Sequence, residues 1–204
     1  MKIHEVLDRD PRSSSLANEG QARIRMESDE RAVRELRAEL ETFVCDGQYS
    51  DAIERILQNY LTKLDQPRQT AAWVSGFFGS GKSHLLKMLG HLWKNTVFED
   101  GSTARSVVPL LSDSIVALLR ELDTQANRVG KPAVALAGTL PSGRGEHVRL
   151  TVLSIILRAC GLPEHYAQAR FWFWLREQGY LDKVRTAVEA DSKDWLSELN
   201  NLYA

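Results

Sequence analysis

Residues 73–89 have the sequence WVSGFFGSGKSHLLKML, and this stretch decides the fold that the sequence predicts. It passes from a short apolar run through three glycines into a segment whose apolar residues recur at helical spacing. Residues 76–83 fit the phosphate-loop pattern GxxxxGK[ST] at every required position. From average residue usage, fewer than about one in a hundred chains of this length would contain such a match by chance. The sequence therefore predicts a nucleotide-binding loop between a strand and a helix.

Each residue type in this pattern has a chemical reason. Backbone N–H groups converge on a phosphate when the chain curls around it, and glycine permits both the dihedral angles and the close approach. Lys82 would place its ammonium on the β- and γ-phosphates, and the Ser83 hydroxyl would join the Mg²⁺ shell. The helix that follows would direct its positive N-terminal end at the phosphates. The predicted cofactors are ATP and Mg²⁺, and the predicted binding residues are Gly76, Phe77, Phe78, Gly79, Ser80, Gly81, Lys82 and Ser83.

The apolar runs on either side of the loop predict a sheet. Residues 71–75 and residues 132–140 are short apolar segments, which is typical of buried parallel strands. An amphipathic helix over residues 51–64 comes directly before the first of them, an order that resembles AAA+ ATPases. We therefore expect the α/β class, with a partial P-loop NTPase core of AAA+ type, a helical N-terminal lead-in and a helical C-terminal tail.

Helix signals divide the rest of the chain. Ser28 and Ser50 are predicted to cap two amphipathic helices, the first of which would run through Val44 to Gly47. Ser112 or Asp113 would cap another helix, and residues 148–160 form a strongly apolar one. The tail would hold two or three further helices, separated by Gly179 and Ser192. The predicted organisation is an N-terminal arm (1–27), a helical lead-in (28–66), a partial ATPase core (67–160) and a helical tail (161–204).

Hydrolysis needs groups that the sequence does not clearly supply. A P-loop ATPase uses an acidic residue at a strand end, a group that orients water, and often an arginine finger. Asp113 is the best acidic candidate, but a helix N-terminus explains it more simply. Glu146 fits the first turn of a helix, and Arg144 fits a solvated loop. The catalytic residues therefore stay unassigned.

Composition excludes some function classes and leaves others open. The chain has 204 residues with a net charge of −1, which gives no global attraction to nucleic acid or acidic lipid. Its start is charged and without an apolar leader, so we expect a cytoplasmic protein without a membrane segment. Cys45 and Cys160 lack metal-ligand spacing and are predicted to be reduced core thiols. The aromatic run at residues 171–174 suits core and interface packing better than the stacking of single-stranded nucleic acid.

Three stretches, two of them before the generic loop and one that includes it, resemble one family. They are ELETFVCDGQY at residues 39–49, ERIL at residues 54–57 and WVSGFFGSGKSHL at residues 73–85. They resemble the N-terminal region of the P-loop ATPase BrxC of bacteriophage-exclusion (BREX) systems, and AGTL, VRL and ACGLP at residues 137–140, 148–150 and 159–163 fit the same pattern. Members of that family are several times longer than this chain. The resemblance implies antiviral defence alongside a DNA methyltransferase and other BREX components, in an oligomer or complex where DNA contact is possible.

Two functions follow as expectations. The first is an ATP-binding N-terminal module of a large phage-defence ATPase, in which hydrolysis requires parts outside this chain. The alternative is an interaction or assembly module whose nucleotide site is structural or regulatory and supports no turnover. Nucleotide turnover by the longer parent protein would distinguish the two.

Overall fold

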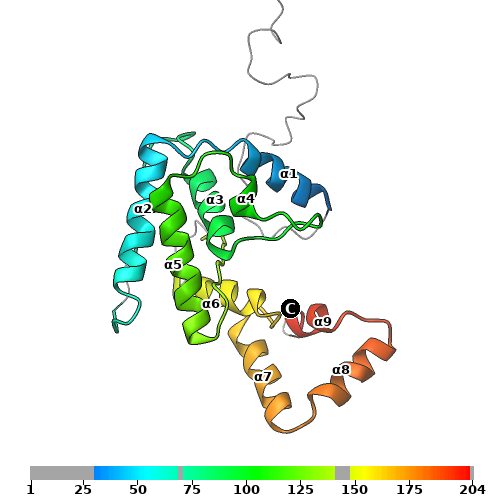
Figure 1. Ribbon diagram of the computed structural model, residues 1–204. Helices are drawn as coiled ribbons and strands as arrows, with labels where there is room; N and C mark the ends of the chain where they lie inside the picture. Colours follow the sequence, from blue (N-terminus) through cyan, green and yellow to red (C-terminus); the bar gives the residue numbers. More distant parts are fainter. Residues whose placement is uncertain (1–29, 69–70, 141–147, 203–204) are drawn as a thin grey trace, which may run out of the picture. The chain divides into compact units, whose positions relative to one another are not determined.

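A computed structural model describes residues 30–68, 71–140 and 148–202, and these residues form two compact units (Figure 1). The first unit extends to Ala135 and the second begins at Leu136. All regular secondary structure in the described ranges is helical, apart from one isolated bridge between Val97 and Thr103. Each unit is described by itself below.

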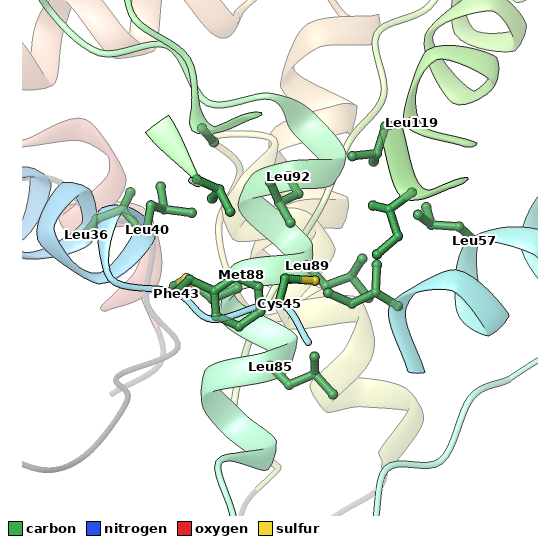
Figure 2. Close-up of a cluster of buried hydrophobic side chains, with 14 of the residues drawn as sticks. Leu36, Leu40, Phe43, Cys45, Leu57, Leu85, Met88, Leu89, Leu92 and Leu119 are labelled. Carbon is green, nitrogen blue, oxygen red and sulfur yellow. The ribbon is translucent and has the colours of Figure 1, made fainter. Parts of the chain in front are cut away.

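The first unit is built around α3, which directly follows the phosphate loop. Its helices are α1 (Glu30–Glu41), α2 (Gly47–Thr62), α3 (Lys82–Lys94), α4 (Ala104–Val107) and α5 (Asp113–Val129). The helices α2 and α5 pack side by side (Figure 1). In Figure 2, the apolar side of α3 lies between the side chains of α1 and those of α2 and α5. Buried residues of this core include Leu36, Leu40, Leu57, Leu85, Met88, Leu89, Leu92 and Leu119.

A buried ion pair joins α1 to α3. Lys87 Nζ lies 2.7 Å from Glu39 Oε2, and the two side chains are only 7% and 9% exposed. The contact is an ion pair rather than a well-directed hydrogen bond, because Glu39 Oε2 has no hydrogen-bond partner of suitable geometry. The helix that carries the loop is therefore tied to α1 by charge as well as by apolar packing.

The C-terminal end of α3 is held by one arginine. Arg105 donates to the carbonyls of Leu92 (2.7 Å) and Trp93 (3.0 Å), which belong to the last turn of α3. It also donates to the Leu119 carbonyl (3.3 Å) and to Asp123 Oδ1 (3.0 Å), both on α5. Since the last carbonyls of a helix have no partner within the helix, Arg105 satisfies groups that would otherwise need water.

The second unit is a chain of helices that pack on their sequence neighbours. They are α6 (Val148–Ala159), α7 (Tyr166–Glu177), α8 (Leu181–Ala190) and α9 (Trp195–Asn200). The predicted separators Gly179 and Ser192 both have positive φ, 73° and 58°, so the two expected breaks in the tail are confirmed. Its buried apolar residues are few: Leu157, Pro163, Ala169, Leu175 and Leu199.

The predicted α/β class is wrong for the described residues. The segments 71–75 and 132–140 form no strand: within the described ranges, the N–H groups of residues 71–76 and 132–140 donate no backbone hydrogen bond to another segment. Val74 packs against the core of the first unit, whereas Trp73 is 91% exposed and Val134 is 61% exposed. A buried strand needs neighbours on its hydrogen-bonding edges, and these apolar runs have no such neighbour in the part of the chain that the structure describes. The described part of the chain is therefore all-helical, which conflicts with a P-loop NTPase core of AAA+ type.

Several helix boundaries also differ from prediction. The first helix ends at Glu41, not at Gly47, and Val44 is 66% exposed. Asp46, and not Ser50, caps α2, because its carboxylate accepts the N–H of Gly47. Ser112 caps α5 as expected by accepting the N–H of Ile115.

Two further observations concern side-chain placement and membranes. Cys45 is buried as predicted, but Cys160 is exposed, so its assignment to the core is wrong. Within the described ranges, no helix combines the length and apolar character needed to cross a bilayer.

Candidate phosphate-binding loop

The predicted loop connects the extended segment at 71–77 to the first turn of α3. Gly79 and Gly81 have φ of 79° and 76°, in the left-handed region that favours glycine. The N–H of Ser80 donates to the Phe77 carbonyl at 3.2 Å, which closes a turn. The helix then begins with the bond from the Leu85 N–H to the Gly81 carbonyl at 2.8 Å.

Gly76 closes the loop from the other side. A side chain there would place its Cβ 2.8 Å from Ser80 Oγ and 3.8 Å from Lys82 Cδ. The start of the loop therefore lies against the side chains at its end, and only glycine fits without displacing Ser80. Gly76, Ser80 and Lys82 therefore lie close together in a curled segment.

Lys82 points back into this loop. Its Nζ donates to the Phe77 carbonyl at 2.6 Å and lies 3.3 Å from Ser80 Oγ. No carboxylate of the described residues forms a salt bridge with it, and the first turn of α3 holds no acidic residue. The N-terminus of a helix carries partial positive charge, so a lysine at its first position adds like charge. The positive charge of Lys82 thus adds to that of the α3 N-terminus, and no carboxylate among the described residues offsets them.

The two residues after Lys82 differ in environment. Ser83 is exposed, and its hydroxyl makes no hydrogen bond to the described residues. His84 is partly buried, edge-on to Phe43 with 5.6 Å between the ring centroids. Burial lowers the pKa of His84, and Lys87 acts in the same direction, while the charge of Glu39 opposes both. The lowered pKa favours the neutral form of His84, whose ring packs against Phe43.

The tip of the loop is aromatic and exposed. Phe77 and Phe78 are 91% and 100% exposed, which is unusual for such large apolar side chains. Neither side chain belongs to the apolar core, and the Phe77 carbonyl accepts hydrogen bonds from Lys82 Nζ and the Ser80 N–H.

The residues present fit a bound polyphosphate and one Mg²⁺ ligand. The Lys82 ammonium lacks a counter-ion among the described residues, the Ser83 hydroxyl is unengaged, and the loop has the curled backbone that phosphate needs. When bound, Mg²⁺ would neutralise phosphate charge, and Ser83 is the residue that would hold it. No group of three or more His, Cys, Asp or Glu side chains in the described ranges is arranged to hold a metal by itself.

Of the candidate hydrolytic residues, the structure describes Asp113. Asp113 is exposed in the first turn of α5, directly after its Ser112 cap, which agrees with a helix-terminus role. Arg144 and Glu146 lie outside the described residues. Sequence reasoning missed Tyr49, whose hydroxyl donates to the Ser80 carbonyl at 3.0 Å from a position 31 residues away.

No protein-family model matches the chain, and no solved structure matches it significantly.

Proposed function

We propose that this chain binds the polyphosphate of Mg-ATP through the loop at residues 76–83. The observation that carries the proposal is Lys82: a cation at the first position of a helix, turned into a curled glycine loop, with no carboxylate partner among the described residues. Such an arrangement costs free energy unless an anion completes it. A polyphosphate supplies that anion and matches the N–H groups of the loop.

We further propose a cytoplasmic phage-defence role as the nucleotide-binding module of a BREX ATPase. This step rests on the resemblance of residues 39–49, 54–57 and 73–85 to that family. Other BREX components, including a DNA methyltransferase, would be its partners in an oligomer or complex. Hydrolysis would require groups outside this chain, because among the described residues no carboxylate pairs with Lys82 and none lies in the first turn of α3.

A specific observation favours the second candidate, an assembly module with a nucleotide site that supports no turnover. Trp73, Phe77 and Phe78 are all at least 91% exposed and lie within six residues of one another at the loop. Exposed aromatic side chains gathered in this way mark interaction surfaces. In this reading, nucleotide would order the loop while the aromatic side chains contact another protein.

Nucleotide binding is tested by thermal unfolding with and without Mg-ATP. At about 100 times Kd, binding adds about 2.7 kcal/mol to the free energy of unfolding. For a chain of this length that raises Tm by roughly 5–10 °C. Lys82→Ala should abolish the rise and leave the Tm of the nucleotide-free protein nearly unchanged, because its ammonium contacts only the loop.

Lys94→Ala is the matched control, since Lys94 lies at the opposite end of the same helix. Lys94→Ala should show the same increase of Tm with Mg-ATP as the unaltered chain. An equal rise in Lys82→Ala would refute the site, and no rise in the unaltered chain would refute nucleotide binding itself.

A further inference from the structure

Tyr49 connects the core of the first unit to the phosphate loop. It is the third residue of α2, and its ring packs edge-on against Phe43, with 6.2 Å between the ring centroids. Phe43 is itself only 3% exposed, so the tyrosine ring rests on a fixed neighbour. From this position the hydroxyl donates to the carbonyl of Ser80 at 3.0 Å.

The fit between Tyr49 and the loop is close enough to require glycine at position 81. A Cβ on Gly81 would lie 1.9 Å from the Tyr49 hydroxyl and 3.1 Å from its ring carbon Cζ. Gly79 has a similar positive φ but nothing within 4 Å of the same position. Gly79 is therefore needed only for its dihedral angle, whereas Gly81 is needed also because Tyr49 occupies the space.

The hydrogen bond fixes the orientation of one peptide plane. In a trans peptide the C=O and the following N–H point in opposite directions. Because the Ser80 carbonyl points at the Tyr49 hydroxyl, the Gly81 N–H points away from Tyr49. That N–H donates no hydrogen bond to any described residue, so it is available to a ligand.

We propose that Tyr49 is a positioning residue of the phosphate loop, which aims the Gly81 N–H at a bound phosphate by holding the Ser80 carbonyl. This inference rests on the proposed polyphosphate site. Without the hydroxyl, the peptide between Ser80 and Gly81 loses the hydrogen bond that fixes the direction of its carbonyl, and ligand binding carries the entropic cost of ordering it.

The test is the affinity of the 204-residue chain for a fluorescent N-methylanthraniloyl derivative of ATP in the presence of Mg²⁺. Tyr49→Phe removes the hydroxyl and keeps the ring, and it should raise Kd about three- to tenfold, the range of one net hydrogen bond. Tyr60→Phe is the matched control, because Tyr60 lies on the same helix and packs on Trp93, while its hydroxyl makes no hydrogen bond to a described residue. Its Kd should equal that of the unaltered chain.

A second ligand separates positioning from general structural damage. Inorganic tripolyphosphate carries the phosphates alone, and its Kd in competition should rise by the same factor in Tyr49→Phe. In Tyr49→Phe, Tm without nucleotide should stay unchanged, and so should the number of binding sites per chain. If Tyr49 only supported the structure, the variant would instead have a lower Tm and fewer sites, with an unaltered Kd at the sites that remain.

Gly81→Ala provides an independent test. Its effect on Kd should be smaller in the Tyr49→Phe background than alone, because removing the hydroxyl removes the nearest collision. Equal effects in both backgrounds, or an unchanged Kd in Tyr49→Phe, would overturn the inference and leave the nucleotide site standing. An unaltered chain that binds neither ligand would instead overturn the proposed function on which the inference rests.

Discussion

Replacement of Lys87 by methionine should destabilise the first unit strongly. The change removes the ammonium that lies 2.7 Å from Glu39 Oε2 and leaves a carboxylate whose side chain is only 9% exposed. Breaking a buried ion pair from one side costs about 3–5 kcal/mol, because the remaining charge is uncompensated. For a chain of 204 residues, with about 2–4 °C per kcal/mol, Tm should fall by roughly 6–20 °C.

Removing both the Glu39 and the Lys87 charge should destabilise the protein much less than removing Lys87 alone. Buried pairs replaced by apolar residues of similar volume are often neutral or more stable. Glu39→Met combined with Lys87→Met should therefore recover most of the lost stability. Arg34→Met is the control, because its pair with Glu30 is exposed (72% and 83%) and should contribute little.

The assay is urea unfolding followed by circular dichroism, with the midpoint shift read at unchanged slope. Two measurements would refute the reasoning. One is a Lys87→Met variant within about 1 kcal/mol of the unaltered chain, well below the cost of an uncompensated charge. The other is a double variant no more stable than the single one, which would show that the loss comes from packing and not from charge.

Three further outcomes are expected. The rate of phosphate release by this chain should equal the rate of its Lys82→Ala variant. Asp113→Asn should not change that rate, because Asp113 serves the N-terminus of α5. A measurable rate that Asp113→Asn abolishes would contradict this prediction. The free energy of unfolding should fall as pH drops below about 6.5, because the pKa of His84 is lower in the folded state and the unfolded state therefore binds more protons. His84→Gln should reduce this dependence of the free energy of unfolding on pH. An unchanged dependence in the variant would refute the prediction. The carboxyl of Asp100 should titrate in NMR near its pKa of about 2, held low first by the Ser102 hydroxyl and then by Arg37, and Ser102→Ala should move the midpoint toward 3.8.

Sequence patterns predicted the helices because their signals are local. The apolar spacing of α5 and the Ser112 cap lie within one segment, and so do the breaks at Gly179 and Ser192. The boundary between α1 and α2 was misplaced because Asp46 and Ser50 are both good caps by residue type, and the hydrogen bond from the Gly47 N–H to Asp46 is not visible in the sequence.

The prediction of strands at residues 71–75 and 132–140 was wrong for a different reason. An apolar run such as residues 132–140 carries the same local signal whether or not a neighbour pairs with it. Strand formation depends on hydrogen bonds to distant segments, which composition and periodicity do not encode. The described residues contain no such neighbour, so the runs remain extended and largely exposed.

Only those parts of the candidate site that are contiguous in sequence could be predicted from it. The loop pattern identifies Gly76 and Lys82 without reference to the rest of the chain. Tyr49 and the pair of Glu39 with Lys87 depend on how α1, α2 and α3 pack, and single residues of those types give no signal in sequence. A tyrosine near the start of the preceding helix could be recognised only after the loop geometry was known.

The contacts of Arg105 also have a consequence for local opening. One permanently charged guanidinium donates both to the last carbonyls of α3 and to the middle of α5, so it couples the end of one helix to the other. Release of the Leu92 and Trp93 carbonyls withdraws the same group from Asp123. Amide protons at the end of α3 and in the central turns of α5 should therefore exchange with solvent through a single shared opening, so that these two segments behave as one cooperative foldon.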